Sequence, residues 1–260
     1  MNKIKNNKLK NKLKEKEISF GSWITTGHTN IAEIMAQSGF EWLTIDMEHS
    51  VITLDIAQQL IQIIEAYDVV PLVRVGEKNP NIIKRVMDAG AYGVIVPMVN
   101  TKKDAELAVN SVKYPPIGTR GVGLARAQGY GLGFEEYNKC LNEKSIVIVQ
   151  IEHIEAVNNL EKILSVEGVD GCIIGPYDLS GSLGHPGEFN NPKVIAALKK
   201  VEKTCAKMKT PLGMHVIPPD YKKVIEYTSR GYTFLAFSLD TLFLASSCKE
   251  QLNKLKKGVK

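Results

Sequence analysis

The chain contains only four cysteines in 260 residues, and no two of them form a Cys-x-x-Cys pair. This scattered spacing argues against a disulfide framework and against a zinc finger. Cys172 lies within a short apolar run, so we expect it to be a small residue of the hydrophobic core.

Long hydrophobic runs are also missing from the sequence. No stretch approaches the roughly 20 apolar residues that a membrane-spanning helix needs. The lysines near the N-terminus are not followed by the apolar segment of a secretory signal. We therefore expect a cytoplasmic protein without a membrane partner.

The excess of positive charge is confined to one end of the chain. Residues 1–17 contain seven Lys and two Glu, which accounts for the whole net charge of +5, so the other 243 residues are formally neutral. No basic face is implied, and no nucleic-acid partner is expected. We expect this Lys-rich extension to be frayed or solvated. The alternative is a helix that docks on the folded body or on a neighbouring chain through Ile4, Leu9 and Leu13.

Beyond residue 17, short apolar segments alternate with amphipathic ones. Most of the apolar segments are hydrophobic on both faces, as strands are in a parallel sheet covered by helices. The predicted strands are ISFGSWI, WLTIDM, VVPLVRV, GVIVPMV, IVIVQIE, GCIIGP, PLGMHV and FLAFSL. The predicted helices are 30–38, with Thr29 as a possible N-cap, and 53–67, 79–89, 101–112, 155–165, 193–208, 219–229 and 241–255.

Eight strands alternating with eight helices predict an α/β fold of the (β/α)8 TIM-barrel type, as a single domain over residues 18–260. A doubly wound open sheet is the alternative, but no Gly-x-Gly-x-x-Gly follows the first strand. The connection 113–145 is too long for a plain loop, which is typical of a functional segment. We interpret its glycine-rich part, GYGLG at 129–133, as a flexible active-site or oligomer loop.

Ionisable residues follow several predicted strands. A lone charge in the middle of a sheet would lose its hydration at high cost, whereas the carboxyl ends of barrel strands form the usual ligand site. This placement predicts an enzyme that uses carboxylates, a histidine and an arginine together. The residues concerned are Asp46, Glu48, His49, Arg74, Glu152 and Asp178.

Asp46 and His49 are three residues apart, and an aspartate beside a histidine can fix its tautomer and raise its basicity. The alternative is a helix-capping aspartate and a surface histidine. Arg74 offers a planar, always-charged group that suits an oxyanion or a carboxylate. The same side chain can also form an ion pair with Asp46 or Glu48, and the two roles are compatible.

Glu152 and Asp178 end adjacent predicted strands. Two such carboxylates can hold one divalent cation, with water and substrate oxygens completing the coordination shell. The alternative is a pair of salt-bridged or capping acids, with Asp178 capping a short helix through 180–182. Gln150 shares a strand face with Glu152, so we expect it to orient a neighbour.

Several longer motifs, in order along the chain, carry a family resemblance. They are DMEHS at 46–50, PLVRV at 71–75, DAGAYGVIVPMV at 88–99, YPPIGTRGVG at 114–123, QIE at 150–152 and GVDGCIIGPYDLSGSLG at 168–184. Together they cover about residues 18–245. The chain resembles the class II pyruvate aldolases of the HpcH/HpaI family, which include the 4-hydroxy-2-oxoheptanedioate and 2-dehydro-3-deoxyglucarate aldolases.

The resemblance implies a barrel of the phosphoenolpyruvate/pyruvate type in which pyruvate chelates Mg²⁺, Mn²⁺ or Co²⁺ and reacts with an aldehyde through an enolate. By this resemblance Glu152 and Asp178 match the metal ligands, and Arg74 matches the arginine on the keto oxygen. His49 matches the catalytic base with Asp46 as its partner. The remaining matches are Gln150 as a substrate-contacting or supporting glutamine, Gly175, Pro176 and Asp178 as the carboxylate-binding loop, and His215 at an aldehyde-pocket position that is often apolar.

The resemblance further implies a homo-oligomer, a hexamer of paired trimers with exchanged C-terminal helices. Other departures from the family pattern are HIEAV at 153–157 and LARAQGYGLG at 124–133. Two other functions remain as alternatives: a lyase acting on a CoA thioester, as in citrate-lyase-like barrels, and a non-catalytic barrel that binds an oxo acid. A Schiff-base aldolase is disfavoured because no lysine occupies an obvious strand end.

Overall fold

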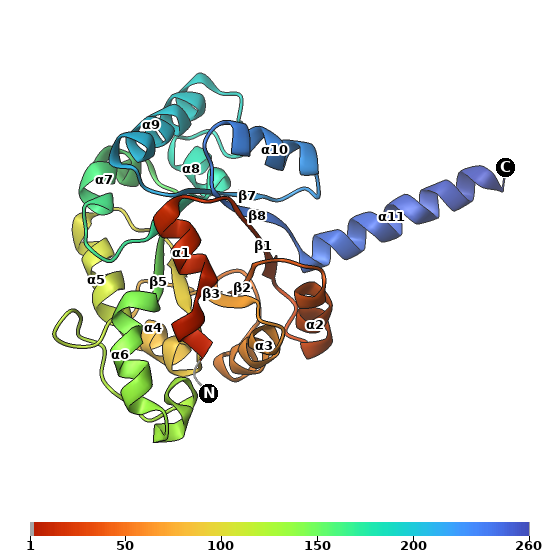
Figure 1. Ribbon diagram of the computed structural model, residues 1–260. Coiled ribbons are helices and arrows are strands. Elements are labelled where there is room, and N and C mark those ends of the chain that lie inside the picture. The colour runs from red at the N-terminus through yellow and green to blue at the C-terminus, as the bar shows by residue number, and fades with distance from the viewer. Residues whose placement is uncertain (1–2, 260) are drawn as a thin grey trace.

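The computed structural model describes residues 3–259; residues 1, 2 and 260 of the predicted extension and barrel domain lie outside the described part. Its centre is a closed barrel of eight parallel strands in sequence order, which confirms the predicted fold (Figure 1). The strands are β1 (Ser19–Ile24), β2 (Trp42–Asp46), β3 (Val70–Arg74), β4 (Gly93–Val96), β5 (Ile146–Ile151), β6 (Gly171–Ile174), β7 (Leu212–Val216) and β8 (Phe234–Leu239).

Helices form at the places where the amphipathic segments predicted them; all but the last surround the barrel (Figure 1). They are α2 (Thr29–Gln37), α3 (Leu54–Ala66), α4 (Pro80–Asp88), α5 (Lys102–Val112), α7 (Ile154–Leu164), α9 (Pro192–Met208), α10 (Tyr221–Ser229) and α11 (Asp240–Gly258). One predicted cap is wrong by a residue. The N-cap of α2 is His28, whose Nδ1 accepts from the amide of Asn30, and Thr29 is the first helical residue.

The amino-terminal end of the barrel is filled by aromatic rings. Trp42 and Phe234 stack with ring centroids 4.1 Å apart. A Cβ on Gly21 would lie 2.0 Å from the Trp42 indole, so only glycine leaves room for this stack. Cys172 is fully buried in β6, which confirms its prediction as a core residue. This packed end is the rigid base on which the opposite, functional end is built.

The expectation that the N-terminal extension is frayed or solvated is wrong for its described residues. Helix α1 (Lys8–Glu15) lies across the amino-terminal end of the barrel and buries Leu9 and Leu13 (Figure 1). Lys10 is buried as well: its Nζ donates to the carbonyl of Ser145 at 2.7 Å and pairs with the Asp170 carboxylate. The helix docks because this lysine neutralises an acid and satisfies a carbonyl at the strand starts, a contact that composition alone does not reveal.

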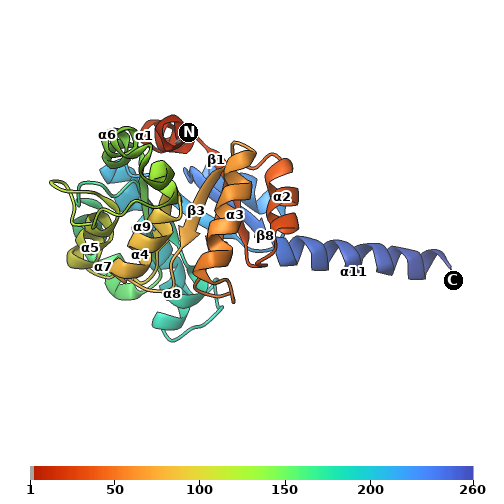
Figure 2. The same cartoon turned by 90° about the horizontal axis from the view of Figure 1, so that it is seen from below.

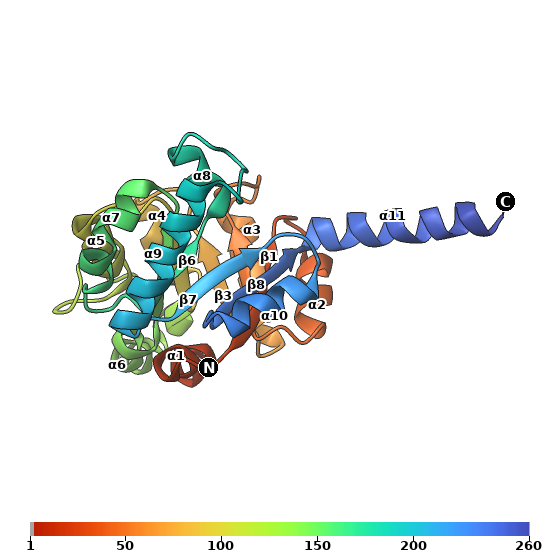
Figure 3. The ribbon, with the colours of Figure 1, turned by 90° about the horizontal axis from the view of Figure 1, so that it is seen from above.

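The long connection after α5 contains a short 3-10 helix, η2 (Arg126–Gly131), and α6 (Phe134–Lys144), which was not predicted. Both η2 and α6 lie toward the amino-terminal end, where Gly129 and Leu132 border a cavity with Gly90 and Tyr92, which come just before β4. In Figure 3, α1 and α6 lie at one end of the barrel and α8 (Pro176–Ser182) at the other. The active-site interpretation of GYGLG is therefore wrong, and its role in an oligomer stays a prediction.

Helix α11 extends away from the barrel as one straight rod (Figures 1 and 2). Three of its leucines, Leu244, Leu252 and Leu255, are exposed. Packing of this helix on a neighbouring subunit stays a prediction. Within residues 3–259, no helix combines the length and the apolar character that crossing a membrane requires.

Candidate active site

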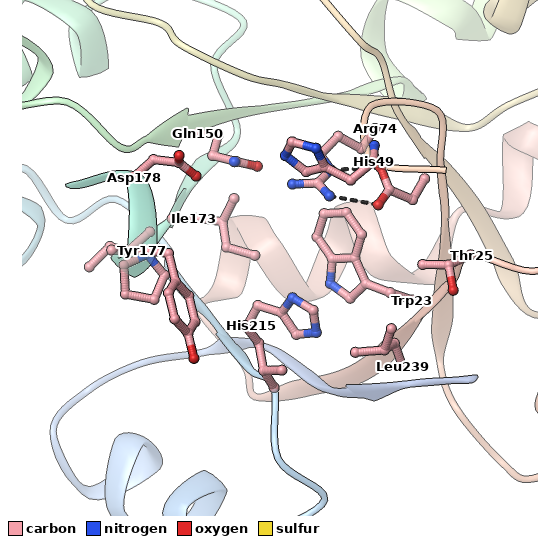
Figure 4. A pocket seen from close by; sticks show the side chains of 15 residues that line it. Trp23, Thr25, His49, Arg74, Gln150, Ile173, Tyr177, Asp178, His215 and Leu239 are labelled. Atoms are coloured by element: carbon pink, nitrogen blue, oxygen red, sulfur yellow. Dashed lines mark hydrogen bonds and ion pairs between the residues drawn. The ribbon is translucent and has the colours of Figure 1, made fainter. Parts of the chain in front are cut away.

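A cavity of about 340 Å³ opens at the carboxyl ends of the strands. Figure 4 shows Arg74 and His49 on one side, Gln150 and Asp178 on a second, and Trp23 with His215 on a third. The structure therefore brings most of the predicted site residues into one place. The lining residues are Trp23, Thr25, Asp46, His49, Arg74, Gln150, Ile173, Ile174, Gly175, Pro176, Tyr177, Asp178, His215, Ile217 and Leu239.

The pairing of β2 with β3 sets Asp46 beside Arg74, because the two residues occupy matched positions in the register. Arg74 Nε donates to Asp46 Oδ1 at 2.9 Å, and Nη2 donates to Oδ2 at 2.6 Å. The guanidinium also lies 4.3 Å from the centroid of the Trp23 ring. The predicted ion pair of Arg74 is confirmed, and it holds the guanidinium plane fixed at the cavity wall.

Glu48 adds a second acid to this arginine. Its Oε2 lies 3.1 Å from Arg74 Nη1, but the geometry is not that of a hydrogen bond, and this buried oxygen has no donor within the described residues. Burial raises the pKa of Glu48 to about 7; Arg74 opposes the rise, and the nearby carboxylates, Glu152 foremost, add to it. The acids of this mouth therefore carry more negative charge than Arg74 balances.

His49 stands at the rim with its ring largely exposed, at 64% of the side-chain surface. Its Nε2 lies 3.8 Å from Glu48 Oε2. Asp46 contacts His49 through the backbone, since Oδ1 accepts from the His49 amide at 3.2 Å, and no hydrogen bond joins the two side chains within residues 3–259. The carboxylate nearest the His49 ring is thus Glu48, while Asp46 holds Arg74.

Glu152 follows β5 and is held from two sides. Its Oε1 accepts from the Met98 amide at 2.6 Å, and its Oε2 accepts from the Gln150 side chain. Burial raises the pKa of Glu152, and these hydrogen bonds oppose the rise. Through this hydrogen bond Gln150 can orient Glu152, which is the role expected of it. Met98 adopts φ 52°, in the left-handed region, which is strained for a residue with a side chain.

The turn after β6 carries Asp178. Gly175 precedes helix α8, and a Cβ there would lie 2.7 Å from Glu152 Oε2, so only glycine lets the turn approach this carboxylate. Pro176 begins α8, and Asp178 is in its first turn, within the helix instead of capping 180–182. Asp178 lines the main cavity and also a neighbouring one that Glu152 lines. The two acids therefore meet at one edge of the mouth.

This donor set suits a hard divalent cation, because its ligand atoms are carboxylate oxygens. Glu48 Oε2 accepts no hydrogen bond from the described residues, and burial raises the pKa of both Glu48 and Glu152, so a cation bound beside these carboxylates would favour their charged forms. In the described part of the chain, no group of three or more His, Cys, Asp and Glu side chains is placed to hold a metal. Glu152 and Asp178 would thus need water or substrate oxygens as further ligands.

Sequence reasoning missed some residues of the mouth. Trp23 is the last residue but one of β1 and stacks on His215 with ring centroids 5.0 Å apart. Thr25 and Tyr177 also line the cavity. An aromatic residue near a strand end reads as core from sequence, so Trp23 carried no usable signal. Tyr177 could have been found, because it lies between Pro176 and Asp178 in a motif that was already assigned to the site.

Comparisons with known proteins agree on one family. The model of the family described as HpcH/HpaI aldolase/citrate lyase matches residues 19–247. The 2-keto-3-deoxy-L-rhamnonate aldolase of Escherichia coli (strain K12) is 34% identical over 260 residues, covering 99% of this chain and 96% of that protein.

The fold is shared with solved structures, one of which carries the same family name. A HpcH/HpaI aldolase/citrate lyase family protein from Burkholderia cenocepacia J2315 superposes with a TM-score of 0.91 at 32% identity, covering 96% of this chain and 99% of that one. The citrate synthase SbnG superposes with a TM-score of 0.86 at 26% identity, covering 97% and 99%.

Proposed function

The chain belongs to the HpcH/HpaI aldolase/citrate lyase family, and we propose that this carbon–carbon lyase is a divalent-metal-dependent aldolase of 4-hydroxy-2-oxo acids. It would form these acids from pyruvate and an aldehyde, or cleave them, through the enolate of pyruvate. The observation that carries the proposal is the meeting of Glu152 and Asp178 at one edge of the mouth that Arg74 also lines.

Glu152 and Asp178 would hold Mg²⁺, Mn²⁺ or Co²⁺. A bound divalent ion supplies Lewis-acid polarisation of a substrate oxygen. The chain contributes the placement of its own acids: the Met98 amide and the Gln150 side chain each hold one oxygen of Glu152, which fixes the direction of that carboxylate. The turn at Gly175 and Pro176 lies beside it and would receive the carboxylate of pyruvate.

Arg74 would stabilise the oxygen of the enolate. Two of its nitrogens are occupied by Asp46, so the guanidinium is preorganised and needs little rearrangement as charge develops. Nη1 forms an ion pair with Glu48 Oε2 at 3.1 Å but makes no hydrogen bond to it, so the N–H groups of Nη1 remain for substrate.

His49 would move the proton of the pyruvate methyl group, directly or through a water. Its ring lines the cavity and is exposed to it. No lysine lines this cavity within residues 3–259, which supports enolate chemistry over a Schiff base.

Exchange of the pyruvate methyl protons with deuterium tests this proposal without any aldehyde. The protein with Mg²⁺ or Mn²⁺ should exchange them, and protein freed of metal by a chelator should not. A barrel that only binds an oxo acid would leave the methyl signal intact in both samples.

A citrate-type reaction on a CoA thioester is the second candidate, because the family name and the citrate synthase SbnG both point to it. The aldolase is favoured by the identity of 34% to a named aldolase, against 26% to SbnG. Acetyl-CoA with oxaloacetate, offered in place of pyruvate with an aldehyde, would separate the two.

We also propose that the protein assembles as a homo-oligomer, a hexamer in the form that the family resemblance implies. The exposed leucines of α11 support this, since an isolated helix does not gain from apolar residues in water. Light scattering on the purified protein would give the mass directly.

A further inference from the structure

His215 lies on β7, across the cavity from Gln150 and Asp178 (Figure 4). It also lines a second, adjoining cavity of about 870 Å³ together with Tyr177 and Ile217. A substrate whose keto-acid end lies against Glu152 and Asp178 would extend its other end toward this histidine. The side chain of His215 is therefore placed to meet the aldehyde partner.

The tautomer of His215 follows from its one hydrogen bond. Nε2 lies 3.0 Å from the carbonyl oxygen of Ser238, and a carbonyl can only accept, so Nε2 carries the hydrogen. The ring plane is fixed separately, because His215 stacks on Trp23 with an interplanar angle of 15°. Two contacts thus hold both the tautomer and the orientation.

The second ring nitrogen, Nδ1, is then a lone-pair acceptor. Burial lowers the pKa of His215 to about 4, and Arg74 acts in the same direction, while the Ser238 carbonyl and Asp46 oppose the fall. The ring is neutral at neutral pH. Within residues 3–259 no group donates a hydrogen bond to Nδ1.

We propose that His215 is a specificity-determining residue that accepts a hydrogen bond from a hydroxyl group of the aldehyde partner. The enzyme then favours hydroxylated aldehydes over alkyl aldehydes and over aldehydes that end in a carboxylate. This inference rests on the proposed aldolase function.

The selection against carboxylate-ended aldehydes has two causes. A carboxylate oxygen would face the Nδ1 lone pair, so two acceptors would meet without a proton between them. Arg74 is the one Lys or Arg side chain among the described residues that line the cavity, and its charge is engaged by Asp46 and Glu48. Lys223 lines the adjoining cavity but not this one, and it is exposed. A second anion held beside His215 in the first cavity would therefore be buried without a counter-ion.

The test compares kcat/KM for 2-hydroxypropanal, propanal and 4-oxobutanoate, each with pyruvate and Mg²⁺. His215→Phe keeps a ring to stack on Trp23 but has no acceptor, and Ser22 Oγ still donates to the Ser238 carbonyl at 3.2 Å. His215→Gln can donate to that carbonyl and keep an acceptor. The hydroxypropanal-to-propanal ratio should fall about tenfold in His215→Phe, equivalent to about 1.4 kcal/mol, and recover in His215→Gln. Taking the ratio cancels any loss of kcat/KM that the substitution causes equally for both aldehydes.

An unchanged ratio in His215→Phe, or a wild-type preference for 4-oxobutanoate over 2-hydroxypropanal, would overturn the role of His215. If His215→Phe does not fold, ring ¹⁵N NMR of the wild-type protein decides: a hydrogen on Nδ1 overturns the role, and a hydrogen on Nε2 alone supports it. Deuterium exchange of pyruvate separates a failure of the His215 proposal from a failure of the proposed aldolase function. If pyruvate exchanges but the hydroxypropanal-to-propanal ratio is unchanged in His215→Phe, only the role of His215 is wrong. If metal-loaded protein shows no exchange, the aldolase function is wrong, and the role of His215 with it.

Discussion

Asp46 and Arg74 stand side by side on β2 and β3 and form a two-point ion pair, Nε to Oδ1 at 2.9 Å and Nη2 to Oδ2 at 2.6 Å. The pair directs the third guanidinium nitrogen, Nη1, toward Glu48. Asp46 therefore acts on the orientation of Arg74, and its contact with His49 runs through the backbone amide of that residue. Catalytic predictions for this mouth depend on that division of roles.

Arg74→Lys should reduce kcat more than it raises KM for pyruvate. Lysine keeps the charge but cannot bond Asp46 at two points and still direct a donor at the substrate. Losing one preorganised donor to an oxyanion costs about 3–4 kcal/mol. Steady-state kinetics and thermal melting on one preparation would check this. A destabilised variant with near-normal kcat would mean that Arg74 serves only the ion pair.

Glu152→Ala should weaken the binding of Mn²⁺ and abolish pyruvate proton exchange, because one of the two proposed ligands is lost. Calorimetric titration of metal into the apo-protein measures the affinity. Glu155→Ala is the matched control, since Glu155 is exposed in the first turn of α7. Equal affinity for metal in both variants would place the ion elsewhere.

His49→Ala should slow the exchange of pyruvate methyl protons by about 10²–10⁴-fold, the usual contribution of a positioned base. Metal should still bind, because the ring is not among the proposed ligands. Exchange is followed by NMR in deuterated buffer, with Mn²⁺ affinity as the control. An exchange rate equal to the wild type would remove His49 from the proton transfer.

Glu48 should make the metal-free protein less stable as pH rises from about 4.5 to about 7. Its pKa in the folded protein is raised from 4.5 to about 7, mainly by burial, so the folded state binds more protons than the unfolded state in this window. Glu48→Gln removes this contribution, and its free energy of unfolding should fall less over the same interval. Urea denaturation at pH 5 and pH 7.5 measures the difference; parallel falls in both proteins would contradict the raised pKa.

Lys10→Ala should destabilise the fold by about 3–5 kcal/mol, the usual cost of removing one partner of a buried ion pair. Asp170 would keep its hydrogen bond from the Val147 amide but lose its cation. Lys14→Ala is the control, because Lys14 lies on the same helix, with an exposed side chain and a longer ion pair at 3.7 Å. Similar melting temperatures for the two variants would show that the Lys10–Asp170 pair adds little to stability.

Much of the barrel was predictable from the order of residues along the chain. Strands such as Ile146–Ile151 are apolar on both faces. This pattern is typical of a parallel sheet whose outer face is covered by helices. The positions of Arg74, Glu152 and Asp178 were predictable for a second reason: the carboxyl ends of all parallel strands in a barrel lie at the same rim.

The failures lie where a residue's environment comes from distant parts of the chain. The sequence around Lys10 predicts a solvated lysine, because its partners, Asp170 and Ser145, are 160 and 135 residues away along the chain. The GYGLG segment is predicted as a loop, but its sequence does not indicate at which end of the barrel that loop lies. The packing of α6 against the amino-terminal end places it there (Figure 3).

The sequence by itself determined that this chain forms a (β/α)8 barrel with acids, an arginine and a histidine at its mouth, because hydrophobic periodicity and strand ends are local properties of the chain. Tertiary structure alone decided which acid serves which partner. Asp46 is three residues from His49 and 28 from Arg74 in sequence. The β2–β3 register nevertheless places its carboxylate on Arg74 and leaves Glu48 nearest the His49 ring. Strand register is set by the closure of the whole barrel, and no segment of the chain contains that information on its own.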